Sequence, residues 1–107
     1  GTEDRSYRKS ADSYTVLGPW LVTADEIADP GNLDFSIEVN GEPRQRANTR
    51  DLITGIAELI EVASHVYTLY PGDVIMTGTP EGVNTVQPGD VMHARIEGLG
   101  EMDVAVR

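Results

Sequence analysis

The clearest hydrophobic pattern in the chain is a strict alternation around residue 35. Apolar residues there are separated by single polar ones, in the order Leu33, Asp34, Phe35, Ser36, Ile37, Glu38 and Val39. Period-two spacing is typical of a strand with one buried face. The dipeptide Asn40-Gly41 comes next and favours a two-residue hairpin turn, because both residues tolerate positive φ. The return segment 42–47 is mostly polar, so the pattern predicts a hairpin whose second strand is an exposed edge.

In the middle of the chain the hydrophobic period changes to three and four residues. This spacing is typical of an amphipathic helix, and the residues that follow it are Leu52, Ile53, Ile56, Leu59, Ile60, Ala63, Val66 and Tyr67. Asn48 or Thr49 can cap the N-terminus, and Tyr70-Pro71-Gly72 ends the element. The pattern predicts one amphipathic helix over about residues 50–67.

Shorter apolar runs predict further strands on both sides of the helix. One run lies within residues 13–27, and residues 74–77 form a run short enough for a strand that is buried on both faces. Two more runs occupy residues 91–96 and 102–106. Together with the hairpin this makes about six short strands and one helix, without the β-α-β alternation of a Rossmann-type sheet. The fold class we expect is therefore α+β, mostly β.

Turn signals separate these runs. The tetrapeptide Pro-Gly-Asp-Val occurs twice, at 71–74 and 88–91, and each copy places Pro-Gly where a type II turn precedes a strand. Thr23 and Glu26 form a capping-box pattern that favours a single helical turn. Two copies of one turn are too few for a repeat architecture.

Composition narrows the class of partner. The chain has 107 residues, one domain at most, and a formal net charge of −10. Such a surface repels phosphate backbones and anionic lipids, so we expect neither nucleic acid nor a membrane as a partner. No cysteine is present, which excludes disulfides, zinc–thiolate sites and thiol catalysis. Without a membrane-length apolar run or a signal segment, the expected location is the cytoplasm.

The most distinctive candidate for chemistry is the loop in DVIMTGTPEGV, residues 73–83. An apolar run there ends in two glycines, two threonines and a proline. A phosphate-binding P-loop needs a lysine and a helix after its second glycine, and neither follows Gly82. The residues alone leave two interpretations open: a strand-end turn whose glycines permit positive φ, and one wall of some other active site.

One cationic cluster stands near the start of the chain. Lys9 is the single lysine of the sequence, and Arg5 and Arg8 lie beside it. The cluster is either a solvated group of charges or a cation aimed at a carboxylate or a developing oxyanion.

The histidines and paired carboxylates are weaker candidates. Neither His65 nor His93 has a second histidine or a carboxylate at ligand spacing, so the sequence shows no self-contained metal site. Glu101 and Asp103 are expected to share one face of a strand, and ordinary solvation explains them.

Four blocks of the sequence together resemble the fumarylacetoacetate hydrolase family. They are RKSADSYTVLGPWLVTADEIADPGNL, VNGEPRQRANTRDLI, YPGDVIMTGTPEGV and VQPGDVMHARIEGLG, which stand in the family's order and cover nearly the whole chain. The similarity is to members that resemble 2-hydroxyhepta-2,4-diene-1,7-dioate isomerase and 5-carboxymethyl-2-hydroxymuconate isomerase. It implies a β-roll of stacked mixed sheets, built as a homodimer.

The resemblance also implies a reaction class. Family members hydrolyse a C–C bond between two carbonyls, decarboxylate a β-keto acid, or isomerise an enol to its ketone, and the substrates are small anionic keto or enol dicarboxylic acids of aromatic-compound catabolism. Each reaction develops negative charge on an enolate oxygen, which a divalent cation, Mg²⁺ or Mn²⁺, stabilises as a Lewis acid. Which of the three reactions applies is not decided by the sequence.

Site residues carry over one by one from this resemblance. Lys9 matches the family's catalytic lysine, and Thr79 matches the threonine that faces the substrate, with Gly78 beside it as a further substrate-binding residue. Arg5 and Arg8 are left without an assigned role.

The family's metal ligands have no counterpart in this sequence. They are a Glu-x-Glu pair and an aspartate; no Glu-x-Glu occurs here, and the aspartate would precede Gly1. We therefore expect residues 1–107 to be the C-terminal part of a single catalytic domain whose N-terminal, metal-binding part is its partner. On its own, this chain is expected to bind Mg²⁺ poorly and to be inactive. The alternative function is a non-catalytic, acidic, β-rich interaction domain.

Overall fold

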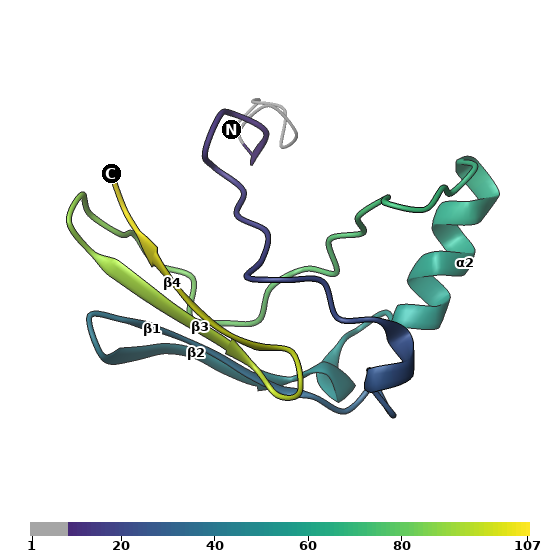
Figure 1. The fold of residues 1–107 in the computed structure, drawn as a ribbon, viewed down its shortest axis with the longest axis horizontal. Coiled ribbons are helices and arrows are strands. Elements are labelled where there is room, and N and C mark those ends of the chain that lie inside the picture. The colour runs from purple at the N-terminus through teal and green to yellow at the C-terminus, as the bar shows by residue number, and fades with distance from the viewer. Residues whose placement is uncertain (1–8) are drawn as a thin grey trace.

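The computed structural model describes residues 9–107, which form one antiparallel sheet with a single α-helix beside it (Figure 1). The strands of the sheet are β1 (Asp34–Val39), β2 (Glu42–Asn48), β3 (Val91–Ile96) and β4 (Gly100–Ala105), and the helix is α2 (Ile56–Val66). The strand order in the sheet is β2-β1-β3-β4. The expected fold class, mostly β with one helix, is confirmed. Arg5 and Arg8 lie outside the described residues.

The predicted hairpin is present as β1 and β2. Asn40 and Gly41 have φ values of 51° and 81°, the positive values that a type I′ turn requires at both central positions. A bulge between Ile37 and Glu38 interrupts the β1–β2 register. Strand β2 pairs with β1 alone and is therefore the exposed edge that its polar sequence predicted.

The sheet has one apolar face and one charged face, because residues paired across strands share a face. Phe35 pairs with Ala47 and Ile96, and Ile37 pairs with Gln45 and Ala94. Gln45 is thus a polar residue on the apolar face. The opposite face carries the charged side chains, among them Glu38, Arg46, His93, Arg95, Glu101 and Asp103.

The helix is shorter than the sequence predicted. The expected helix over about 50–67 is wrong at its start, because α2 begins at Ile56 after Gly55 as N-cap. Thr49–Asp51 forms a separate 3₁₀ turn, in which the Asn48 side chain accepts a hydrogen bond from the Arg50 N–H at 2.9 Å. Leu52 follows with φ −57° and ψ 129°, an extended conformation that interrupts the helix while the apolar spacing continues across the break.

Two of the predicted strands are absent from the described residues. Residues 14–22 and 74–77 run as irregular backbone without a ladder partner. Leu21 is 90% exposed and Met76 is 69% exposed, so these runs lack the neighbouring strands that would bury them. The prediction that residues 74–77 are buried on both faces is therefore wrong for this chain. The turn expected after Thr23 is present as a 3₁₀ turn, Ala24–Glu26.

Both Pro-Gly turns have the predicted geometry. Gly72 and Gly89 have φ values of 97° and 96°, as the third residue of a type II turn requires. In each turn the aspartate after the glycine makes two hydrogen bonds to the residue before the proline. The Asp73 N–H donates to the Tyr70 carbonyl oxygen, and the Tyr70 N–H donates to the Asp73 carboxylate. Asp90 and Gln87 are bonded in the same way.

The chain covers little of its own apolar surface. Its accessible surface is 8911 Å², against about 5,800 Å² for a compact monomer of this mass. The radius of gyration is 15.0 Å, where a compact domain of this length has about 13 Å. Among residues 9–107, Val39 is the one buried apolar side chain, and α2 stands beside one end of the sheet rather than against its face (Figure 1). Within the same residues, no helix has the length and apolar character that a membrane crossing requires.

Candidate functional site

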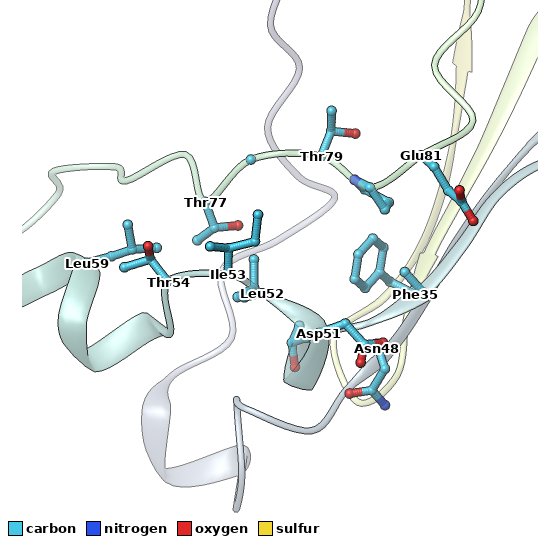
Figure 2. Close-up of a pocket in the computed structure, with 14 residues that line it drawn as sticks. Phe35, Asn48, Asp51, Leu52, Ile53, Thr54, Leu59, Thr77, Thr79 and Glu81 are labelled. Carbon is cyan, nitrogen blue, oxygen red and sulfur yellow. The ribbon is translucent and has the colours of Figure 1, made fainter.

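One cleft lies where the segment 77–81 crosses the end of the sheet nearest α2 (Figure 2). Its volume is about 480 Å³, the size of a small-molecule site. The lining comes from the sheet, from the connection between β2 and α2, from α2 itself and from the crossing segment, and includes Phe35, Ala47, Asn48, Thr49, Asp51, Leu52, Ile53, Thr54, Leu59, Thr77, Gly78, Thr79, Pro80 and Glu81. The cleft is thus apolar at its base and carries hydroxyl and carboxylate groups around it.

Two of the three site residues expected from the sequence belong to this cleft. Gly78 and Thr79 line it, and Gly78 has φ 103°, a conformation that favours glycine. Lys9 is not among the lining residues; its side chain is exposed, and its carbonyl accepts a hydrogen bond from the Thr15 hydroxyl at 2.9 Å. The structure therefore brings Gly78 and Thr79 together but does not bring Lys9 to them.

The two threonines of this segment point to different sides of it. Figure 2 shows Thr77 directed toward Ile53, whereas Thr79 is directed away from Phe35. The hydroxyl of Thr79 therefore lies on the outer side of the segment rather than over the apolar base. A polar ligand that Thr79 binds would lie on that outer side.

Gln45 on β2 holds this segment, and sequence reasoning missed it. Its Nε2 lies 2.9 Å from the Thr79 Oγ1, 2.9 Å from the Pro80 carbonyl oxygen and 3.3 Å from the Glu81 carbonyl oxygen. One amide group thus bonds three successive residues of the loop. A glutamine on the apolar face of a strand was the available signal, because a polar side chain on that face needs partners.

A second contact between the loop and β2 is the close approach of Gly82 to the backbone of Arg44. A Cβ on Gly82 would overlap the Arg44 carbonyl oxygen and would come within 3.2 Å of the Gln45 Cγ. Gly82 also has φ 98°. Only glycine permits this contact, so the loop and the strand depend on each other for position.

The charged residues that line the cleft are all acidic. Asp51 and Glu81 are among its lining residues, whereas no Lys, Arg or His is among them. Within residues 9–107, no group of three or more His, Asp or Glu side chains is placed to hold a metal ion. These residues therefore do not fit a divalent cation by themselves, and an anionic ligand here requires positive charge from elsewhere.

A second polar cluster lies on the charged face of the sheet, away from the cleft. The His93 Nδ1 lies 2.6 Å from the Asp103 Oδ1, and its Nε2 lies 3.6 Å from the Glu101 Oε2. The hydrogen bond that His93 donates to Asp103 raises the pKa of His93, and the charges of Asp103, Glu101 and Glu38 raise it further. Glu101 and Asp103 share one face of β4 and are exposed, as expected, and the β3–β4 register in addition places Asp103 directly opposite His93.

This cluster predicts a pH dependence of stability. The folded pKa of His93 lies above its ordinary value of 6.5, so the stabilisation is fully present below about pH 6.5 and is lost as the pH rises through the folded pKa. We expect the NMR titration midpoint of His93 to lie above 6.5 and to fall in Asp103→Asn. We also expect the free energy of unfolding of His93→Gln to lack this decrease with pH. A midpoint that does not change in Asp103→Asn contradicts the assignment.

The sequence of this chain is similar to those of known hydrolases. A family model described as the C-terminal part of fumarylacetoacetate hydrolase matches residues 2–107. A maleylpyruvate hydrolase from Aquipseudomonas alcaligenes is 64% identical over 107 residues, which are 100% of this chain and 37% of that protein.

Solved structures agree with this match. The crystal structure of maleylpyruvate hydrolase from Sphingobium sp. SYK-6, in complex with manganese(II) and pyruvate, superimposes with a TM-score of 0.93 at 50% identity, over 95% of this chain and 39% of that one. A 2-hydroxyhepta-2,4-diene-1,7-dioate isomerase from Mycobacterium marinum gives a TM-score of 0.77 at 43% identity, over 83% of this chain and 34% of that one. The chain thus spans between 34% and 39% of the length of these relatives.

Proposed function

This chain belongs to the fumarylacetoacetate hydrolase family, and we propose that residues 1–107 are the C-terminal part of a divalent-metal-dependent enzyme that hydrolyses an acylpyruvate. The observation that carries the proposal is the 64% identity to a maleylpyruvate hydrolase across the whole chain. Maleylpyruvate is therefore the first candidate substrate. It is a small anionic keto acid of the kind that arises in aromatic-compound catabolism.

The reaction determines what the site must supply. Water adds to the maleyl carbonyl carbon, the C–C bond to the pyruvoyl methylene breaks, and maleate and pyruvate are formed. The electrons of the broken bond leave on the pyruvate fragment as an enolate, which then takes a proton at carbon. Groups that stabilise negative charge on the enolate oxygen therefore lower the barrier.

Two residues of this chain are assigned to that task. The Lys9 ammonium stabilises the enolate or the substrate carboxylate, an assignment carried by the family resemblance alone. The Thr79 hydroxyl donates a hydrogen bond to a substrate oxygen, and Gly78 permits the turn that brings Thr79 to the substrate. The position of Thr79 at the segment that crosses the cleft supports this role.

The charge of the cleft supports an external cation. A dianionic substrate bound by Thr79 on the outer side of the segment needs a compensating cation, and the residues that line the neighbouring cleft include Asp51 and Glu81 but no Lys, Arg or His. The Mn²⁺ or Mg²⁺ of the complete enzyme would be held by carboxylates of the N-terminal part. When bound, the cation supplies Lewis-acid stabilisation of the enolate.

The uncovered surface supports the assignment to a partial domain. Leu21, Ile53 and Met76 are 90%, 104% and 69% exposed, and apolar side chains of this size are normally covered in a complete domain. The N-terminal part of the same enzyme is the partner we propose for these surfaces. A homodimer and a cytoplasmic location, both expected from the sequence, belong to the same proposal.

The proposal is tested by product formation. The complete enzyme, incubated with Mn²⁺ or Mg²⁺ and maleylpyruvate, is expected to release pyruvate and maleate, measured by a coupled lactate dehydrogenase assay and by chromatography. Oxaloacetate and 5-carboxymethyl-2-hydroxymuconate are tested in parallel, because decarboxylation and isomerisation develop the same enolate. No turnover of any of the three would contradict the proposal and would favour a non-catalytic, acidic interaction domain.

A further inference from the structure

We propose that Gln45 is a positioning residue that fixes the Thr79 hydroxyl as a hydrogen-bond donor toward the substrate. The inference rests on the proposed function, since it concerns how Thr79 meets an anionic keto acid. It adds a residue from strand β2 to a site whose other members were assigned from the family motif.

The first step concerns the direction of the hydrogen bonds. The Pro80 and Glu81 carbonyl oxygens can only accept, so the group of Gln45 that faces them is its NH₂, at 2.9 and 3.3 Å. The same NH₂ lies 2.9 Å from the Thr79 Oγ1. Thr79 therefore accepts from Gln45, and its own hydroxyl hydrogen is free to point elsewhere.

The second step concerns what the free hydrogen meets. Carboxylates and enolates are acceptors only, so a threonine that binds them must donate. Without Gln45 the hydroxyl hydrogen would be free to turn toward the neighbouring carbonyl oxygens. The two hydrogens of the Gln45 NH₂ are shared among the Thr79 Oγ1 and the two carbonyl oxygens, so these carbonyls already have a donor and the Thr79 hydrogen is left to donate on the outer side of the segment.

The third step concerns how rigidly this is held. Gln45 is half-buried on the apolar face of β2, opposite Ile37. The close approach of Gly82 to Arg44 holds the loop at the same strand by a separate contact. Both contacts fix the loop in one position relative to β2, so the direction of the Thr79 hydroxyl is set before substrate binds.

Reversing the polarity of Gln45 tests the proposal. In Gln45→Glu the carboxylate repels the two carbonyls and accepts from Thr79, so the hydroxyl turns away from the substrate. We expect KM for the substrate of the complete enzyme to rise about five- to tenfold, the value of one hydrogen bond, with kcat changed less than about twofold. Thr79→Val is expected to give a similar rise.

The double variant separates positioning from a general structural effect. If Gln45 acts through Thr79, Gln45→Glu in the Thr79→Val background raises KM no further, whereas independent effects multiply. Gln87→Glu is the matched control, because it introduces the same charge at an exposed glutamine outside the cleft, and it is expected to leave KM unchanged. Multiplicative effects, or an unchanged KM in Gln45→Glu, would overturn the proposal.

A second measurement keeps this test distinct from that of the proposed function. Hydrogen–deuterium exchange of the amides of residues 78–83 is expected to accelerate in Gln45→Glu and not in Gln87→Glu. If the wild-type enzyme turns over none of the candidate substrates, the proposed function fails, and the exchange rates still decide whether Gln45 holds the loop. Unchanged exchange in Gln45→Glu overturns the positioning role.

Discussion

Replacing Lys9 with methionine is expected to lower kcat of the complete enzyme by about 10²–10³-fold, which is the effect of removing one donor from an oxyanion site. Lys9 is the single lysine of the chain, and its side chain is exposed in the described structure. The substitution therefore removes a charge without opening a cavity in this chain. We expect the thermal unfolding midpoint to stay within about 1–2 °C, because surface substitutions of this kind change stability little.

The control for Lys9→Met is Arg107→Met, which removes an exposed positive charge of the same sign at the other end of the chain. Steady-state kinetics and thermal unfolding of both variants separate a catalytic role from a change in net charge. A kcat of Lys9→Met equal to that of the wild type would remove Lys9 from the mechanism. An equal loss of kcat in both variants would assign the effect to net charge.

Replacing Gly82 with alanine is expected to displace the loop from β2. The new Cβ would overlap the Arg44 carbonyl oxygen and would come within 3.1 Å of the Arg44 carbonyl carbon, and φ 98° is unfavourable for alanine. Overpacking against backbone destabilises by about 1–3 kcal/mol, in addition to about 1–3 kcal/mol of backbone strain. Because the displaced loop carries Thr79, KM is expected to rise more than tenfold.

Gly72→Ala is the matched control for this variant. Gly72 has φ 97°, nearly the value of Gly82, but nothing lies within 4 Å of an added Cβ. It should show the backbone strain alone, with KM unchanged. Equal losses in the free energy of unfolding for the two variants, measured by denaturant titration, would show that the contact between Gly82 and β2 contributes nothing.

The elements that were predicted correctly are specified by their own local sequence. Strand β1 alternates strictly, Asn40-Gly41 specifies its turn, and the two Pro-Gly-Asp turns are closed by residues within the same four positions. Each of these depends on contacts between near neighbours. Their physical causes are therefore contained in a few consecutive residues.

The elements that were predicted wrongly depend on contacts with residues distant in the sequence. Residues 74–77 have the composition of a buried strand, yet a strand forms only where another strand pairs with it, and none does so here. Helix α2 begins late because Leu52 is extended, although the apolar spacing passes through it unchanged. Hydrophobic spacing indicates which side chains are stabilised by burial, but not whether another strand or helix is present to bury them.

The residues of the candidate site also divide into those that a local motif identified and those that depend on distant partners. Thr79 and Gly78 were found because they stand in a recognisable motif. Gln45 was missed because its partner Thr79 is 34 residues away, and Asp103 was missed because only the β3–β4 register places it opposite His93. Both contacts follow from strand pairing, which the local pattern of either residue does not specify.

Metal binding tests the central claim most directly: this chain is the C-terminal part of an enzyme whose metal carboxylates lie in the N-terminal part. Calorimetric titration with Mn²⁺ and with Mg²⁺ compares the complete enzyme with the 107-residue chain. We expect micromolar or tighter binding of at least one cation to the complete enzyme and only weak binding to the chain, because its described residues provide no cluster of ligands. Micromolar binding of either cation to the 107-residue chain would contradict the account, as would the absence of binding to the complete enzyme.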